Sequence, residues 1–106
     1  MVAAGFHRLT VAGLERETDD AVCVRFDIPP ALRANFSFVQ GQYLTLRHTI
    51  GGEDVRRSYS ICSGVDEGCV RIAIKHIEGG RFSSFANDEL KAGDVLEVKP
   101  PEGRFN

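Results

Sequence analysis

Hydrophobic and polar residues alternate along much of this chain, and that alternation predicts strands. Between residues 21 and 28 the apolar side chains of Val22, Val24 and Phe26 fall on one face. A period of two is typical of a half-buried strand. The pattern returns between residues 69 and 77, with polar Arg71 and Lys75 opposite the apolar face. Four further strands are predicted over residues 6–17, 42–49, 54–62 and 94–99.

Turn-forming residues separate these segments. Thr18-Asp19-Asp20 offers short polar side chains for a turn, and Pro29-Pro30 ends the second strand because proline has no N–H to donate to a ladder. Residues 31–35 are expected to make one helical turn. Gly51-Gly52 predicts a tight hairpin between the strands on either side.

One segment changes from the strand period to a helical one. Its apolar residues, Phe82, Phe85, Ala86 and Leu90, are spaced three, one and four apart, which is the spacing of a helix face. Ser83 or Ser84 is expected to cap the start, at about Ser83, and Gly93 to end it. Six short strands and one helix before the last strand predict an all-β fold, a closed six-stranded antiparallel Greek-key barrel with one short α-helix.

Composition and charge exclude several classes of function for this chain. A chain of 106 residues with 42% hydrophobic and 26% charged residues is expected to form one globular domain. Its net charge of −2 argues against a nucleic-acid-binding domain. No apolar run approaches the length of a membrane helix, so no membrane partner is expected. Three cysteines without C-x-x-C spacing, and scattered histidines, predict a cytoplasmic protein with no metal site.

The first candidate for chemistry is the strand segment Arg56-Arg57-Ser58-Tyr59-Ser60. In a strand, Arg57 and Tyr59 point to the same face. That face would offer a guanidinium for a phosphate and an aromatic ring for a planar heteroaromatic group. On this motif alone, a surface strand with an exposed arginine is the commoner explanation.

The second candidate is Gly79-Gly80-Arg81-Phe82-Ser83-Ser84, where two glycines lead directly into the predicted helix. Free N–H groups and the helix dipole make such a start an anion site. An ordinary glycine turn with a serine cap explains the same residues equally well. The motif gains weight beside Arg57, because two anion sites suit one pyrophosphate.

Other residues are expected to be structural. Pro100-Pro101 is interpreted as a linker, His76 as a solvated side chain near the glycine turn, and Cys62 as part of the core. No cysteine is expected to act as a nucleophile, and no catalytic acid or base is assigned.

Taken in order, the motifs resemble the flavin-binding barrel of the ferredoxin–NADP reductase family. Arg-x-Tyr-Ser and Gly-x-x-Ser are flavin motifs of that family, and the resemblance covers nearly the whole chain. One departure is Gln40, where many members have proline. The segments that carry the resemblance are Gly41-Gln42-Tyr43, Arg57-Ser58-Tyr59-Ser60, Gly80-Arg81-Phe82-Ser83 and Pro101-Glu102-Gly103-Arg104-Phe105.

The resemblance implies FAD as cofactor and a role for each motif residue. Arg57 would hold the pyrophosphate, Tyr59 would pack against the isoalloxazine, and Ser60 would hydrogen-bond near flavin N5. Strict alternation places Ser60 opposite Tyr59, so that role needs a twist or a main-chain contact. The implied remainder of the site is Ile74, Lys75, His76 and Ile77 through main-chain groups, and Gly80, Arg81, Phe82 and Ser83 at the helix start.

The resemblance also implies partners. Residues 1–106 are expected to be an FAD-binding barrel domain, with the NAD(P)H-binding and 2Fe-2S domains outside this chain. Electrons would pass from NAD(P)H through FAD to the 2Fe-2S centre and then to an oxygenase component, and the likeness extends to reductases of phenylacetate degradation. Two alternatives stay open, a flavin-free barrel that serves as a binding module and, less favoured by the charge, an oligonucleotide-binding barrel.

Overall fold

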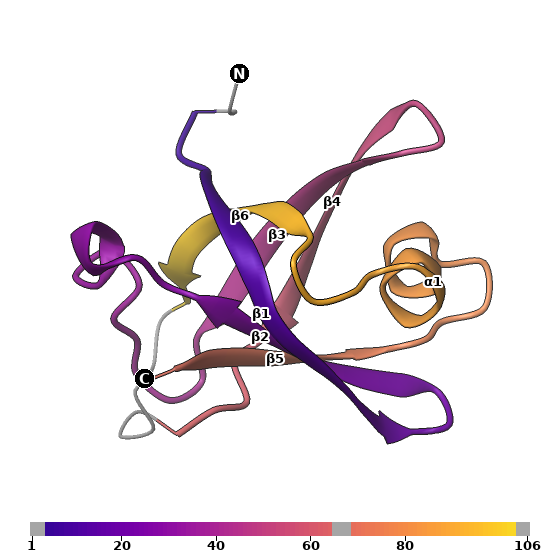
Figure 1. Cartoon of the computed structure of the whole chain (residues 1–106), viewed down its shortest axis with the longest axis horizontal. Coiled ribbons are helices and arrows are strands. Elements are labelled where there is room, and N and C mark those ends of the chain that lie inside the picture. The colour runs from indigo at the N-terminus through magenta and orange to yellow at the C-terminus, as the bar shows by residue number, and fades with distance from the viewer. Residues whose placement is uncertain (1–3, 65–68, 104–106) are drawn as a thin grey trace.

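A computed structural model gives the structure over residues 4–64 and 69–103. Six strands form one sheet in the order β4-β3-β6-β1-β2-β5, and every pairing is antiparallel, so the predicted Greek-key arrangement is confirmed (Figure 1). The strands are β1 (His7–Thr18), β2 (Ala21–Asp27), β3 (Tyr43–Ile50), β4 (Glu53–Ser60), β5 (Val70–Lys75) and β6 (Val95–Glu102). A 3-10 turn η1 (Pro30–Leu32) and one helix, α1 (Arg81–Asp88), complete the fold.

The two outer strands of the sheet, β4 and β5, approach each other without forming a ladder. One isolated bridge joins Ile61, just after β4, to Ile72 in β5. Next to it the N–H of Cys62 donates to the carbonyl of Arg71 at 2.8 Å. The sheet therefore curls into a barrel-like shape in which an isolated bridge, and not a continuous ladder, joins the two outer strands. Helix α1 packs against β2, β3, β4 and β5 at one end (Figure 1).

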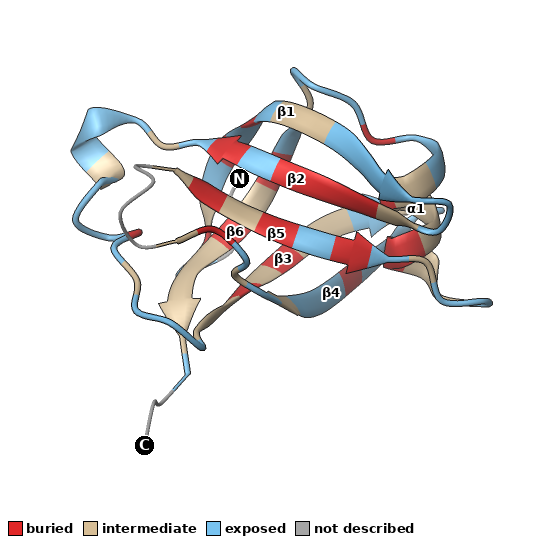
Figure 2. Ribbon diagram, turned by 90° about the horizontal axis from the view of Figure 1, so that it is seen from below, coloured by how far each residue is buried: buried red, intermediate tan, exposed pale blue. Residues whose placement is uncertain are grey.

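The core lies inside the curled sheet, as the alternation predicts. Along β5 buried Val70, Ile72 and Ile74 alternate with more exposed positions (Figure 2). Phe82 of α1 is fully buried and belongs to the same core. Cys23 is also buried, although it lies opposite Val22 and Val24 on β2. Burial is the main reason that the pKa of the Cys23 thiol is raised to about 12, and the neighbouring Cys62 and Glu17 raise it further. Cys23 therefore does not supply a thiolate near neutral pH.

The hairpin between β3 and β4 confirms the expectation for Gly51-Gly52. Ile50 pairs with Glu53, so the loop is two residues long. Both glycines have positive φ, +59° and +83°. That backbone suits a primed turn, which only glycine enters without strain.

Three local predictions are wrong. The helix starts at Arg81, with Gly80 as its N-cap and no serine cap, and its C-cap is Glu89 instead of Gly93. Cys62 is exposed instead of buried, because the chain leaves the β4 ladder after Ser60.

Pro100-Pro101 is the third, because it belongs to β6 and not to a linker. Beyond Val98 the strand pairs with β3 alone. There Thr45 pairs with Lys99 and Tyr43 with Glu102, so β6 carries an extra residue at the prolines. A bulge on a strand with one partner accommodates residues that cannot donate to a ladder.

In the described part of the chain, no helix has the length and apolarity needed to cross a bilayer. Within residues 4–64 and 69–103, no group of three or more His, Cys, Asp or Glu side chains is placed to hold a metal ion.

Candidate functional site

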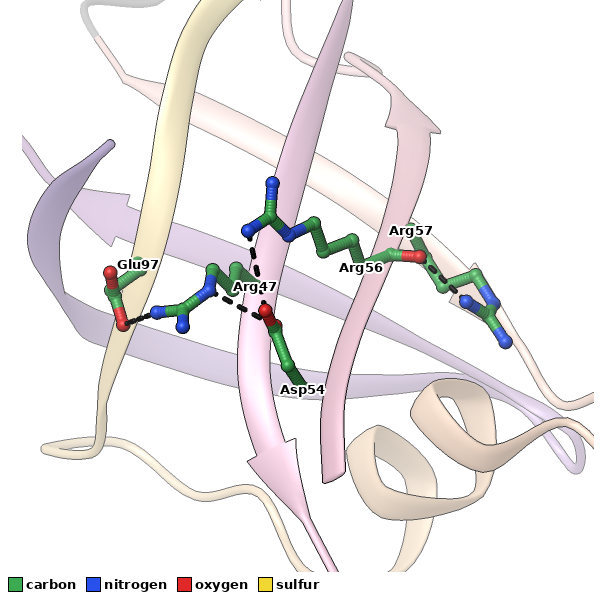
Figure 3. Close-up of polar contacts among 5 residues, drawn as sticks. All are labelled: Arg47, Asp54, Arg56, Arg57 and Glu97. Carbon is green, nitrogen blue, oxygen red and sulfur yellow. Dashed lines mark hydrogen bonds and ion pairs between the residues drawn. The ribbon is translucent and has the colours of Figure 1, made fainter. Parts of the chain in front are cut away.

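Strand β4 directs its two arginines to opposite sides. Figure 3 shows Arg56 and Arg57 leaving the strand in opposite directions, with Arg57 on the side of α1. Arg56 forms an ion pair with Asp54 at 3.2 Å and lies 5.4 Å from the ring centre of Phe6. Arg57 donates to the carbonyl of Arg56 at 2.6 Å, and no carboxylate among the described residues pairs with it. Arg57 is therefore an exposed cation that is available to an anion.

Tyr59 lies on the same side of β4 as Arg57, two residues along the strand. Its side chain is half-buried, and its ring centre lies 5.9 Å from that of Phe82, in the first turn of α1. Burial raises the pKa of the Tyr59 phenol, and the charge of Arg57 acts in the opposite direction. β4 therefore presents an aromatic ring and a cation side by side, against the start of the helix.

The segment from Ile77 to Gly80 is closed by hydrogen bonds just before α1. The N–H of Gly80 donates to the carbonyl of Ile77 at 2.8 Å, and the Ser83 hydroxyl accepts the Ile77 N–H at 3.0 Å. A Cβ on Gly80 would lie 2.6 Å from Ser83 Oγ, so this tight turn requires glycine. The Ser83 side chain is only 3% exposed, and its hydroxyl holds the turn in shape.

The first turn of α1 presents main-chain N–H groups. Those of Arg81, Phe82 and Ser83 precede the first possible intrahelical acceptor, and the first N–H to find one is that of Ser84, which donates to Gly80 O at 3.1 Å. N–H groups at a helix start form an anion site together with the helix dipole. The N–H groups in this first turn are the ones that the second anion site predicted from the sequence would use, and that site stays a prediction.

Several of the expected site residues have their side chains engaged elsewhere. Arg81 donates to the carbonyl of Ile50 at 2.9 Å and forms an ion pair with Glu53 at 2.6 Å, so it fixes α1 to the β3–β4 hairpin. Ile74 and Phe82 are fully buried. Only their main-chain groups could face a ligand.

The remaining expected residues lie nearer the surface. Lys75 and Ser60 are exposed, and Ile77 has 63% of its surface exposed. The His76 ring contacts the Ser84 hydroxyl at 3.2 Å, so His76 has a polar partner on α1. Ser60 lies on the opposite side of β4 from Tyr59, as alternation predicts.

Asn87 is a residue that the sequence analysis does not single out. Its amide nitrogen donates to the carbonyl oxygens of Ser83 at 2.9 Å and Ile74 at 3.2 Å. Its Oδ1 accepts from Arg16 at 2.9 Å. Asn87 therefore ties α1 to β5 and β1. Its one sequence signal is the spacing of four residues after Ser83, which places both on one helix face.

The end of β6 lies against the Gly41-Gln42-Tyr43 motif. Gln42 Nε2 donates to the carbonyl of Gly103 at 3.2 Å, and the Tyr43 ring lies close against Gly103. The first and last family motifs are therefore neighbours in the fold. Arg104 and Phe105 lie outside the described residues.

Comparisons with known proteins identify the family of this chain. The family model for the oxidoreductase FAD-binding domain matches residues 8–106. The chain is 47% identical over 100 residues to one of the subunits of the 1,2-phenylacetyl-CoA epoxidase of Escherichia coli strain K12, a match that covers 94% of the chain and 28% of that protein. The chain thus spans between a quarter and a third of this relative.

Solved structures share the fold. A phthalate dioxygenase reductase matches with a TM-score of 0.72 and 29% identity, over 96% of this chain and 31% of that one. A ferredoxin NADP+ reductase from Neisseria gonorrhoeae, solved with bound FAD and NADP, matches with a TM-score of 0.80 and 19% identity, over 95% and 39%. The resemblance to the ferredoxin–NADP reductase family is confirmed, and the chain belongs to the oxidoreductase FAD-binding domain family.

Proposed function

We propose that this chain holds FAD across β4 and the start of α1, and that residues 1–106 form one FAD-binding domain. The observation that carries the proposal is the pairing of Arg57, a cation with no carboxylate partner among the described residues, with the half-buried ring of Tyr59 on one side of β4. A planar ring system that carries a pyrophosphate needs both features. The first-turn N–H groups of α1 supply a second contact for the same pyrophosphate.

Each residue then has a stated role. Arg57 binds the pyrophosphate from one side, and the main-chain N–H groups of Arg81, Phe82 and Ser83 bind it from the other. Tyr59 packs against the isoalloxazine, with Phe82 behind its ring. Main-chain groups of Ile74–Ile77 line the flavin, and Ser60 reaches the N5 region through a main-chain contact. The Ser83 hydroxyl acts by holding the turn that aims the N–H groups.

The activity of the whole protein is the second part of the proposal. FAD supplies hydride acceptance from a nicotinamide and release of single electrons, and the protein binds, orients and tunes it. We infer transfer from NAD(P)H through FAD to a 2Fe-2S centre and on to an oxygenase, in phenylacetate degradation, inside the cytoplasm. The support is the likeness to part of a phenylacetyl-CoA epoxidase and to a reductase described as carrying electrons from pyridine nucleotides to [2Fe-2S].

Titration of the purified chain with FAD, followed by visible absorbance and flavin fluorescence, tests the binding proposal. Arg57→Ala is expected to weaken binding by about 1.5–3 kcal/mol, the scale of a charged hydrogen bond. Arg56→Ala is the matched control, because it removes the same charge from the other side of β4, and it should change affinity much less. Equal losses in the two variants would contradict the assigned face. No flavin binding by the unaltered chain would favour the binding-module alternative.

A further inference from the structure

A cleft lies at the end of the barrel away from α1. Its volume is about 710 Å³, and its walls come from the end of β2, the segment after η1 and the start of β5. Figure 1 shows the coil that contains η1 on the left and α1 on the right of the molecule. None of the residues that line the cleft belongs to the set proposed for FAD. The cleft therefore needs an explanation of its own.

Two arginines line the cleft, and one of them lies beside an irregularity in β1. Between Val11 and Gly13 the register with β2 shifts, so Ala12 is an extra residue at the cleft wall. Gly13 pairs with Arg25, and a Cβ on Gly13 would lie 2.7 Å from Arg25 Nη2. The Arg25 guanidinium thus lies across the bare backbone of the glycine. Bulges of this kind redirect a side chain.

Positively charged side chains outnumber carboxylates among the described residues that line the cleft. Arg33 is the second cation, and among the described residues neither its guanidinium nor that of Arg25 has a hydrogen bond or ion pair. Asp27 is the one carboxylate among the described residues that line the cleft. A guanidinium without such a partner favours a carboxylate or phosphate, because its N–H groups match the paired oxygens of these anions.

Apolar and aromatic side chains share the rest of the described lining with the polar side chain of Ser37. Phe36 is 2% exposed, and Ile28 and Phe38 are half-buried beside it. Half-buried apolar side chains give a ring-sized group a surface to cover. The arginines can therefore bind a charged group at one end of a ligand, and the apolar side chains can contact a ring at its other end.

We propose that this cleft binds an organic anion in which one carboxylate or phosphate is attached to an apolar, ring-sized body. Arg25 and Arg33 hold the anionic group, and Ile28 and Phe38 contact the ring. This site is separate from the flavin site, and the proposal does not rest on FAD binding.

Backbone amide NMR of the FAD-free chain tests the proposal, with phenyl phosphate as the probe. Resonance shifts are expected at the amides of residues 25–28, 36–38 and 69–70. Inorganic phosphate should bind more weakly because it lacks the ring, and phenol because it lacks the charge. Shifts confined to β4 and the start of α1, or no saturable shifts, would overturn the proposal.

Charge-removing variants sharpen the test. Arg25→Gln and Arg33→Gln are each expected to weaken phenyl phosphate about tenfold, the scale of one charge-assisted hydrogen bond. Arg8→Gln, which removes an exposed arginine that does not line the cleft, is the matched control and should bind normally. Equal affinity in all three variants would contradict the proposal.

Cys69 supplies an independent measurement, because it lines the cleft. In a Cys62→Ser background, which removes the exposed thiol, phenyl phosphate should slow alkylation of Cys69. An alkylation rate that saturating probe leaves unchanged would count against occupancy of the cleft.

Discussion

The hydroxyl of Ser83 accepts the N–H of Ile77 at 3.0 Å, across the turn that leads into α1. The bond joins Ser83, in the first turn of the helix, to Ile77, which lies in the segment between β5 and α1. It therefore determines where the first N–H groups of α1 point, although the hydroxyl itself is almost completely covered. Ser83 acts on an anion at this position through the backbone that it fixes.

Ser83→Ala is expected to lower the free energy of unfolding by about 1 kcal/mol and to weaken FAD binding, because the turn loses the acceptor for Ile77 N–H. Chemical denaturation and flavin titration measure the two effects. Ser84→Ala is the control, since it removes a hydroxyl from the same helix that contacts His76 and not the turn. Equal loss of FAD affinity in the two variants would contradict the positioning role.

Gly80→Ala is expected to be disruptive, because the new Cβ would lie 2.6 Å from Ser83 Oγ. The effects of Gly80→Ala and Ser83→Ala on the free energy of unfolding should be non-additive. The reason is that Ser83→Ala removes the oxygen atom that the new methyl group at position 80 meets. The double-mutant cycle is measured by denaturation. Contacts of 3.0 Å to Ile77 O and 3.2 Å to Ile77 Cβ persist, so relief should be partial. Strict additivity would show that the clash is not with Ser83.

Arg57→Gln is expected to raise the pKa of Tyr59 further above its usual value. Burial already raises this pKa, and the positive charge of Arg57 opposes the rise. Because the folded pKa is raised, the stability contributed by neutral Tyr59 is present below the ordinary tyrosine pKa and is lost as pH rises through the folded value. Ultraviolet difference titration in a Tyr43→Phe background isolates Tyr59, the remaining tyrosine. Arg56→Gln, on the other side of β4, should change the pKa less.

The local pattern of the sequence was sufficient for the strands and the hairpin, because alternation and paired glycines act over a few residues. It was insufficient where a distant partner decides the structure. Pro100-Pro101 is tolerated because β6 pairs there with β3 alone, and Cys62 is exposed because the chain leaves the ladder after Ser60.

In the candidate site, too, the sequence predicts the features that depend on neighbouring residues and misses those that depend on distant contacts. Arg57 and Tyr59 share a face by simple strand geometry, which the sequence predicts. The engagement of Ser83 with Ile77, and of Asn87 with Ile74, depends on how α1 docks against β5. No short-range pattern encodes that docking.

Asp54→Asn is expected to reduce the acid sensitivity of the fold. Burial alone would raise the pKa of the Asp54 carboxyl, but hydrogen bonds and charge from Arg47 and Arg56 lower it below its usual value (Figure 3). A lowered folded pKa contributes stability above the ordinary aspartate pKa, and this stability is lost as pH falls through the folded value. Arg47 would keep its contact with Glu97, at 2.6 Å.

Denaturation midpoints between neutral pH and about pH 3 measure the effect. The unaltered chain should lose more stability over this range than the Asp54→Asn variant does. Asp19→Asn, at an exposed carboxyl in the β1–β2 turn, is the control and should follow the unaltered chain. Parallel curves for the unaltered chain and the Asp54→Asn variant would contradict the assignment.

The isolated 106-residue chain is expected to bind FAD weakly. The resemblance to this family implies a second domain that would face the flavin ring, and on this chain alone that face is expected to be left in water. Apolar burial is worth about 25 cal/mol per Å², so even ~100 Å² of lost contact costs about 2.5 kcal/mol, more than tenfold in affinity. A longer chain that includes such a domain should bind FAD more tightly than residues 1–106 do, which flavin titration of the two chains measures.

NADH or NADPH is expected to reduce nothing on this chain, even with FAD bound. A nicotinamide dinucleotide is typically bound at a glycine-rich turn after a parallel strand, and every strand pair of the described residues is antiparallel. Gly79-Gly80 follows the antiparallel strand β5, and the first-turn N–H groups beyond it are proposed to hold FAD. The test adds NADH or NADPH to the FAD-loaded chain without oxygen and follows flavin absorbance. Dithionite, which needs no nicotinamide site, should bleach the same sample and so shows that the flavin is reducible. Bleaching by NADH or NADPH at an enzyme-like rate would place a nicotinamide site in this barrel. It would contradict the prediction that the nicotinamide binds to a separate domain.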